Sequence, residues 1–195
     1  TDEQRMLVEM THDFVEKEML PHEETLERTD ALPPELAESL KKRAIELGLH
    51  ACNLPEEVGG GGLDAVSVML IEKELGRTSL ALAECAHRPL NILASCVGEQ
   101  VKQFLEPTVR GEKRDCIAMT EPGAGSDLRG MKCKAERVGD DWVINGEKHF
   151  ISQASVSDYC VLFAATGSEA FEDQTVKAPR KYISAFLVDF SDPGV

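Results

Sequence analysis

Positive charge is scarce in this sequence. The 21 lysine and arginine residues are outnumbered by 35 aspartate and glutamate residues, which gives a formal net charge of −14. Such a chain repels the phosphate backbone of nucleic acids, so no nucleic-acid partner is expected. A phosphate-bearing ligand would have to be held by backbone amides and a few local cations.

Closely spaced cysteine pairs are also missing. The six cysteines, at positions 52, 85, 96, 116, 133 and 160, include no Cys-x-x-Cys pair, so neither a zinc site nor a disulfide framework is indicated. We expect reduced thiols packed as small hydrophobic groups in a reducing compartment, the cytoplasm or alternatively the mitochondrial matrix. No metal site is expected, because His12 and Glu16, one helical turn apart, have no second pair beside them.

Long apolar runs and several catalytic motifs are absent. The longest apolar stretch, residues 80–97, contains charged residues and Pro89, which predicts a buried helix or helix pair and no membrane span. The sequence has no G-x-G-x-x-G after a first strand, no Ser/His/Asp triad motif and no Walker loop. These absences argue against a nicotinamide-binding fold, hydrolysis and phosphoryl transfer.

Apolar residues at helical spacing fill residues 1–115. We predict a first helix over 2–20 that stops at Pro21, and a second from Pro33-Pro34 that ends at Gly48. Asp64 is expected to cap a third helix that ends at Gly76. Thr78 or Ser79 should cap the next, and residues 101–109 make one more. The four glycines at 59–62 either only join helices or let the backbone approach a ligand.

After Cys116 the hydrophobic period changes from 3.6 to 2. Strands are expected around 133–135 and 142–144, over 159–165 and over 183–188. The expected separators are Gly139-Asp140, Asn145-Gly146, Gly167 and Pro179-Arg180-Lys181. Helices followed by strands predict an α+β fold, with an all-α domain over 1–115 and an antiparallel β-barrel or sandwich over 116–195.

The stretch Cys116-Ile-Ala-Met-Thr-Glu-Pro-Gly-Ala-Gly-Ser-Asp127 turns a strand into a glycine-rich, hydroxyl-bearing loop. Gly123 and Gly125 allow positive φ and close approach of a ligand, and Thr120 and Ser126 add hydroxyl groups. The segment offers several neutral donors to an extended anionic ligand. The simpler interpretation is a surface turn after a strand.

A second stretch, Asp141-Trp-Val-Ile-Asn-Gly-Glu-Lys-His-Phe-Ile-Ser152, predicts two strands joined by a type I′ turn at Asn145-Gly146. Strand alternation would then turn His149 away from Phe150. Together with the loop above and with Leu54-Pro-Glu-Glu-Val-Gly-Gly-Gly-Gly-Leu63, this stretch resembles the acyl-CoA dehydrogenase flavoprotein family. The resemblance covers essentially the whole chain.

The resemblance implies an FAD site. Residues matching the family's cofactor contacts are Ile117, Ala118, Met119, Thr120, Gly125, Ser126, Phe150, Ile151 and Ser152. Thr120 would lie near the flavin, and Ser126 would also approach the acyl-CoA substrate. The family usually has tryptophan where this chain has Phe150 and threonine where it has Ser152. Both substitutions keep an aromatic face and a short hydroxyl. The alternative interpretation is that Phe150 is a core residue.

The resemblance also implies what this chain lacks. It ends near the end of the family's middle β-domain, so the C-terminal helical bundle is expected to be absent, with its catalytic glutamate and most of a dimer or tetramer contact. No residue here is assigned as catalytic. Glu121 belongs to the binding loop, and nothing except their charge suggests Glu84 or Glu147. The 195-residue chain alone is therefore expected to be inactive.

The activity implied is removal of an α-proton from an acyl-CoA thioester with transfer of the β-hydride to flavin N5, which yields a trans-2-enoyl-CoA. Electrons would then pass to an electron-transferring flavoprotein. Two alternatives stay open. One is an acyl-CoA oxidase or flavin monooxygenase of the same fold, and the other is a non-catalytic module that binds a protein partner through its acidic helical face. The sequence leaves the acyl chain length undecided.

Overall fold

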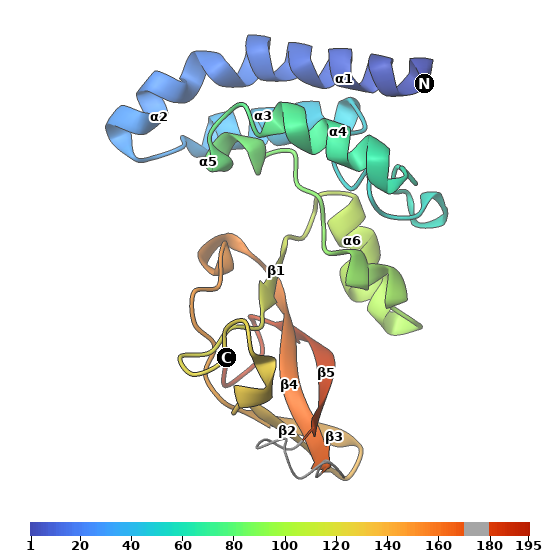
Figure 1. The fold of residues 1–195 in the computed structure, drawn as a ribbon, viewed down its shortest axis with the longest axis vertical. Helices are drawn as coiled ribbons and strands as arrows, with labels where there is room; N and C mark the ends of the chain where they lie inside the picture. The colour runs from blue at the N-terminus through green and yellow to red at the C-terminus, as the bar shows by residue number, and fades with distance from the viewer. Residues whose placement is uncertain (170–179) are drawn as a thin grey trace. The chain divides into compact units, whose positions relative to one another are not determined.

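A computed structural model describes residues 1–169 and 180–195. The chain divides into two compact units, Thr1–Lys113 and Arg114–Val195 (Figure 1). The first unit is helical and the second contains a sheet, so the predicted order of helices before strands is confirmed. Pro179, expected in the link before the last strand, lies outside the described residues.

The first unit consists of α-helices separated by 3₁₀ and π-helical turns. The α-helices are α1 Asp2–Phe14, α2 Glu23–Thr29, α3 Pro34–Glu46, α4 Ala65–Leu75, α5 Leu80–Ala83 and α6 Glu106–Val109. The π-helical turns are Val15–Met19 and Val101–Leu105, and the 3₁₀ turns are Leu20–His22, Glu56–Val58 and Asn91–Ser95. No helix in the described part of the chain is long and apolar enough to cross a membrane.

The predicted stop at Pro21 is wrong. The α-helix already gives way to a π-helical turn at Val15, and Pro21 lies in the 3₁₀ turn that leads directly into α2. Proline is tolerated there because the amide that it lacks would find no partner in the first turn of a helix. The helical path instead ends at Asp30, whose φ of 52° is left-handed.

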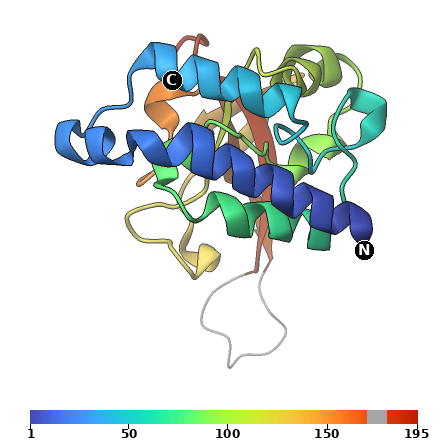
Figure 2. The ribbon, with the colours of Figure 1, turned by 90° about the horizontal axis from the view of Figure 1, so that it is seen from above.

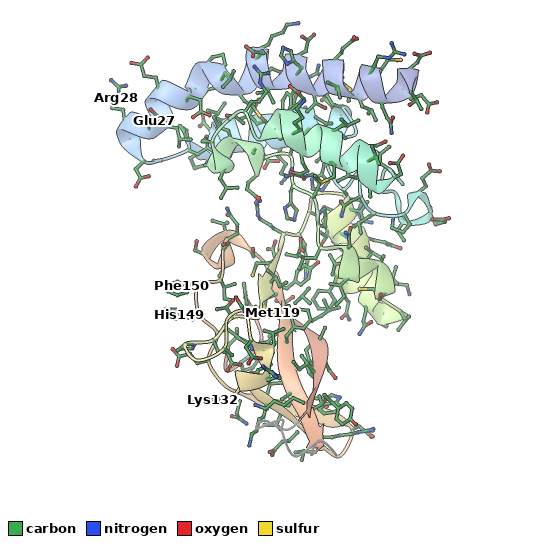
Figure 3. The ribbon with its side chains drawn as sticks, in the orientation of Figure 1. Glu27, Arg28, Met119, Lys132, His149 and Phe150 are labelled. Atoms are coloured by element: carbon green, nitrogen blue, oxygen red, sulfur yellow. The ribbon has the colours of Figure 1, made fainter. Side chains whose placement is uncertain are left out.

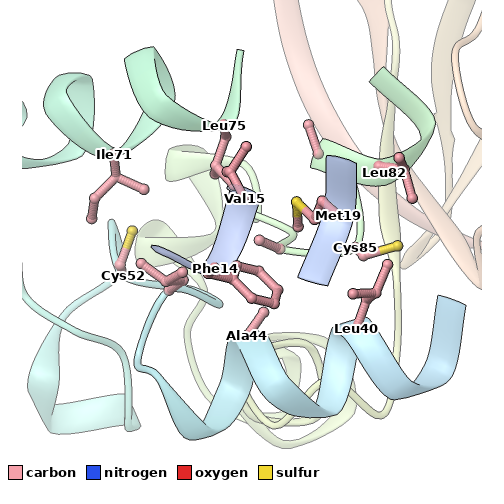
Figure 4. Close-up of a cluster of buried hydrophobic side chains, with 13 residues drawn as sticks. Phe14, Val15, Met19, Leu40, Ala44, Cys52, Ile71, Leu75, Leu82 and Cys85 are labelled. Carbon is pink, nitrogen blue, oxygen red and sulfur yellow. The ribbon is translucent and has the colours of Figure 1, made fainter. Parts of the chain in front are cut away.

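The core of the first unit lies where α1 packs between α3 and α4 (Figure 2). Phe14, Val15 and Met19 are almost fully buried against Leu40 of α3 and Leu75 of α4 (Figure 4). The π-helical turn places Val15 and Met19 on the same buried side as Phe14. Burial of large apolar side chains of this kind is the main stabilising contribution in such a unit.

The helix ends follow the predicted chemistry in two places. Gly48 has φ of 70° just after α3, and Asp64 caps α4, its Oδ1 accepting from the amides of Val66 at 2.8 Å and Ser67 at 3.0 Å. Ser79 precedes α5, but its hydroxyl makes no capping hydrogen bond. The predicted helix or helix pair over 80–97 is reduced to α5 and one 3₁₀ turn, since Pro89 interrupts it.

The glycine run at 59–62 has a structural reason at every position. Gly59 and Gly62 have φ of 89° and 59°. A Cβ atom on Gly60 would lie 2.3 Å from the carbonyl oxygen of Leu54, and one on Gly61 would lie 2.8 Å from Cα of Cys52. Backbone conformation and close packing therefore account for this loop without a ligand.

The second unit is built around one long strand. Its strands are β1 Asp115–Ala118, β2 Lys134–Val138, β3 Asp141–Asn145, β4 Tyr159–Glu169 and β5 Arg180–Asp189. β5 pairs antiparallel with β4 from Tyr159↔Asp189 to Glu169↔Arg180. β1 runs parallel to the start of β4, and β2 meets β4 at Lys134↔Ala165. The sheet is thus mixed: the expected antiparallel pairing holds for β4–β5 and β2–β3, whereas β1 and β2 both pair with β4 in parallel.

The predicted hairpin at Asn145-Gly146 is wrong. β3 ends at Asn145, no strand follows in residues 146–152, and neither turn residue has positive φ. Gly146 is needed for packing, because a Cβ there would lie 2.5 Å from Cα of Cys133. The hairpin forms one turn earlier, between β2 and β3 at Gly139-Asp140, where Gly139 has φ of 65°.

The expected separators around β4 and β5 also need correction. Gly167 lies inside β4, at an irregularity in its pairing with β5, a place where glycine is often found in a strand. Arg180 and Lys181 belong to β5 itself and do not form a link before it.

Candidate functional site

The loop after β1 starts as a tight turn. Glu121 and Ala124 close it through two backbone hydrogen bonds, from the Glu121 amide to Ala124 O at 3.0 Å and from the Ala124 amide to Glu121 O at 3.1 Å. Asp127 then begins the 3₁₀ turn Leu128–Gly130, and its carboxylate accepts from the Arg129 amide at 3.0 Å. Pro122 and Gly123 lie at the exposed tip.

The glycines of this loop differ from those at 59–62. Neither Gly123 nor Gly125 has positive φ, which corrects that part of the expectation. A Cβ on either would meet nothing within 4 Å. Within the described residues, the amides of Gly123, Gly125 and Ser126 donate no hydrogen bond. The loop thus presents bare backbone with free amide donors, the arrangement that allows close approach of an anionic or polar ligand.

The second motif lies directly beside the first. The amide of His149 donates to the carbonyl oxygen of Thr120 at 2.8 Å, which joins the segment before Phe150 to the start of the glycine-rich loop. The two motifs, separate in the sequence, therefore share one edge of the second unit. The segment after β3 that makes this contact is irregular and does not form the predicted second strand of a hairpin.

Phe150 is held in an unusual state. It has φ of 57° and its side chain is 81% exposed, so it is not a core residue. Its ring stacks on that of His149, with centroids 3.7 Å apart and planes at 14° (Figure 3). The expectation that His149 faces away from Phe150 is wrong, because without strand geometry the side chains do not alternate. A left-handed conformation is sterically costly for a bulky residue, and strained residues of this kind cluster at functional sites.

The other predicted residues divide by exposure. Besides Phe150, the exposed members of the set are Ile117, Gly125, Ser126 and Ser152. Thr120 is half-buried. Met119 packs against the cluster that contains Met131 and Cys133, and Ile151 packs against Cys116 and Cys160. Ala118 is 4% exposed and could reach a ligand only through its backbone.

Ile151 also lines an apolar pocket of about 430 Å³ in the second unit. Its walls include Ala118, Cys160, Leu162 and Val188, so they come from β1, β4 and β5. Trp142 is not part of it: this ring is 45% exposed and packs edge-on against Phe186 at 5.5 Å between centroids.

Sequence reasoning missed a buried ion pair beneath the two motifs. Lys148 Nζ lies 2.8 Å from Glu121 Oε1, and the side chains are 8% and 4% exposed. Burial by itself would raise the pKa of the Glu121 carboxyl, but hydrogen bonds from Lys148 and from the amides of Lys132 and Cys133 outweigh it and lower the pKa. Each motif contains one of the two charged residues, and this was the only signal in the sequence. That the two side chains form a pair cannot be read from the sequence.

The polar and aromatic groups of the two motifs fit the needs of a flavin. The pyrimidine edge of an isoalloxazine ring requires hydrogen-bond donors, and its reactive face requires an apolar or aromatic wall. The free amides and the Thr120, Ser126 and Ser152 hydroxyls are such donors, and the Phe150 ring is such a wall. The described residues contain no cluster that could hold a metal ion.

Comparison with known proteins gives a consistent result. A sequence model of the acyl-CoA dehydrogenase N-terminal domain matches residues 1–112, and the model of the family's middle domain matches residues 116–195. A probable acyl-CoA dehydrogenase of Bacillus subtilis (strain 168) is 36% identical over 201 residues, which cover 100% of this chain and 31% of that protein. The mitochondrial short-chain specific acyl-CoA dehydrogenase of Rattus norvegicus is 35% identical, covering 98% and 45%.

A solved structure supports the same assignment. The acyl-CoA dehydrogenase from Bacillus anthracis, crystallised in complex with FAD, superposes with a TM-score of 0.77 at 32% identity. The match covers 100% of this chain and 32% of that one, so the chain spans less than half the length of these relatives. With its helical unit and its sheet-containing unit matching successive domains of one family, the chain belongs to the acyl-CoA dehydrogenase family.

Proposed function

We propose that the full-length protein is an FAD-dependent acyl-CoA dehydrogenase that oxidises an acyl-CoA thioester to a trans-2-enoyl-CoA. The observation that carries the proposal is the hydrogen bond from the His149 amide to Thr120 O, because it joins the start of the glycine-rich loop to the segment that carries the exposed Phe150 ring. We further propose an electron-transferring flavoprotein as electron acceptor, a homodimer or homotetramer as the assembly, and the cytoplasm or mitochondrial matrix as the compartment.

Each residue of the site has a proposed task. Bound FAD would supply the hydride acceptor. Thr120 donates to the flavin ring, Phe150 and Ile151 exclude water from one side, and Ser126 contacts both FAD and the acyl-CoA. Gly125, Ser152 and the backbone of Ile117, Ala118 and Met119 complete the cofactor contacts. Glu121 is unsuited to remove the substrate's α-proton, because its carboxylate is buried and fully engaged. We assign that step to a carboxylate outside this chain.

Anaerobic stopped-flow mixing of the purified full-length protein with a panel of acyl-CoAs tests the proposal. Loss of the flavin's visible absorbance followed by slow reoxidation in air is the expected result. Rapid reoxidation would instead identify an oxidase or monooxygenase of the same fold. A colourless protein that binds neither FAD nor acyl-CoA would contradict flavin chemistry and favour a non-catalytic acidic binding module.

Thr120 and Ser126 should give different phenotypes. Thr120→Val keeps the side-chain shape and removes a donor to the ring, so flavin reduction should slow more than FAD retention falls. Ser126→Ala should mainly raise the KM for acyl-CoA or loosen FAD. A hydrogen bond to a charged group corresponds to about ten-fold to a hundred-fold in the affected constant.

Stopped-flow reduction and thermal melts of both variants separate a role in binding and catalysis from a purely structural role of the loop. If the loop were only a turn, both variants would lower stability by about 1 kcal/mol or less and leave the kinetics unchanged.

A further inference from the structure

The buried ion pair of Glu121 and Lys148 joins three segments of the second unit. Glu121 Oε1 accepts from Lys148 Nζ at 2.8 Å and from the Cys133 amide at 3.0 Å, and Oε2 accepts from the Lys132 amide at 2.6 Å. Lys148 Nζ also donates to the carbonyl oxygen of Met119 at 3.1 Å. One charged pair thus fixes the loop after β1, the entry to β2 and the segment after β3.

The position of this pair relative to the proposed site is specific. Met119 and Glu121 flank Thr120, and both are held by Lys148. The next amide, that of His149, holds the carbonyl oxygen of Thr120 itself. Phe150 follows directly in its left-handed conformation. Residues 119–121 of the glycine-rich loop are therefore fixed to residues 148–150 of the second motif, and the residues involved are consecutive in each segment.

Stability alone is a poor reason for such a pair. Removing two charges from water is costly, and buried ion pairs can often be replaced by apolar residues without loss of stability. What a fully hydrogen-bonded buried network does provide is a single geometry, since each donor and acceptor has one partner arrangement. Sites that bind rigid ligands benefit when that geometry exists before the ligand arrives.

We propose that Glu121 and Lys148 are positioning residues, which hold Thr120 and Phe150 in their flavin-binding arrangement before the cofactor binds. The inference rests on the proposed function for the identity of the ligand. Neither side chain is expected to touch FAD, because both are buried beneath the loop.

Variants of the full-length protein separate positioning from stability. Lys148→Met leaves a buried, unpaired carboxylate, and should weaken FAD binding to the apoprotein by about ten-fold to a hundred-fold and lower the melting temperature. The double variant Glu121→Gln/Lys148→Met removes both charges, so the melting temperature should recover while FAD affinity stays low. Lys132→Met is the matched control: this exposed lysine meets Glu121 only through its backbone, and both measurements should stay at wild-type values.

Two results would overturn the proposal. One is wild-type FAD affinity in the double variant, which would mean that the pair contributes only to stability. The other is wild-type FAD affinity in Lys148→Met. If the wild-type protein itself fails to bind FAD, the proposed function fails and not the positioning role.

Hydrogen exchange of wild-type apoprotein tests the same idea without any variant, and so covers the case in which the variants do not fold. The amides of Lys132, Cys133 and His149 should be protected before FAD is added. Exchange as fast as that of the free Gly125 amide, with protection gained only on adding FAD, would show that the cofactor and not the ion pair organises the site.

Discussion

At the scale of single residues, Glu121 connects protonation to stability. Its pKa is lowered in the folded protein by its hydrogen bonds and by Lys148, which outweigh the effect of burial. A carboxyl whose pKa is lower in the folded state stabilises it above the unfolded pKa, and this contribution disappears as the pH falls through the folded pKa.

Glu121→Gln should therefore destabilise the protein most near neutral pH. Loss of one partner from a buried ion pair costs about 3–5 kcal/mol, because Lys148 is left unpaired. The difference in melting temperature from wild type should begin to shrink as the pH falls below the unfolded pKa of about 4.3. It should disappear only as the pH falls through the lower folded pKa, where the wild-type carboxyl is protonated as well. Glu112→Gln, which changes an exposed carboxyl paired with Arg110, is the control and should show a small difference at every pH. A constant gap for Glu121→Gln would contradict the assignment.

The cysteines should differ in reactivity according to burial. All six are free, and only Cys96 is partly accessible. Burial, together with the neighbouring Cys116 thiol, raises the pKa of Cys160 to about 12. Burial also raises the pKa of Cys52, Cys96, Cys116 and Cys133, so accessibility distinguishes Cys96 from the other cysteines. Since a reagent must reach the sulfur atom to react, an aromatic disulfide reagent should label Cys96 first in the native protein. Mass spectrometry of labelled peptides checks this, and early labelling of Cys160 would disagree with its burial.

At the scale of elements, two glycine loops with similar sequences have different physical roles. In the loop at 59–62, packing against Leu54 and Cys52 leaves no room for side chains. In the loop after β1, Gly123 and Gly125 have open space around them and ordinary backbone conformations. Sequence composition alone could not separate these cases.

A pair of alanine substitutions should separate structure from binding. Gly61→Ala should lower stability by more than about 1 kcal/mol, since a Cβ would lie 2.8 Å from backbone of Cys52 and force a shift. Gly125→Ala should leave the melting temperature unchanged and weaken FAD binding, because the new methyl group occupies only the approach to the backbone. Thermal melts and FAD titration of the full-length protein measure both effects. Unchanged FAD affinity in Gly125→Ala would remove this loop from the cofactor site.

At the scale of the whole molecule, we propose that this chain supplies only part of the cofactor site. It spans 31% to 45% of the length of the two relatives compared by sequence. On this proposal the exposed amides and hydroxyls of the second unit would meet only some of the polar atoms of FAD, whereas the entropy lost on ordering the cofactor would be unchanged.

We therefore expect the isolated 195-residue chain to bind FAD weakly or not at all and to turn over no acyl-CoA. Absorbance spectra of the purified chain, compared with those of the full-length protein prepared in the same way, measure the bound flavin. Stoichiometric yellow protein from the 195-residue chain would show that these residues hold FAD by themselves.

The sequence predicted the order of helices and strands, because hydrophobic period is a local property of the chain. It also predicted local signals that act over a few residues, such as the Asp64 cap and the left-handed Gly48. It failed where a local signal has two physical uses. Asn145-Gly146 is the preferred sequence of a tight turn, yet Gly146 serves close packing against Cys133, and Pro21 fits a helix start as well as a helix end.

What the sequence determined by itself was therefore the two-part architecture and the residue types available to a flavin site. Only the tertiary structure decided how those residues meet. It joined Thr120 to His149, buried Lys148 against Glu121 and turned Phe150 outward. The physical reason is that these contacts connect segments distant in the chain. Their geometry depends on which charges and rings the fold removes from water, and a local sequence pattern does not encode this.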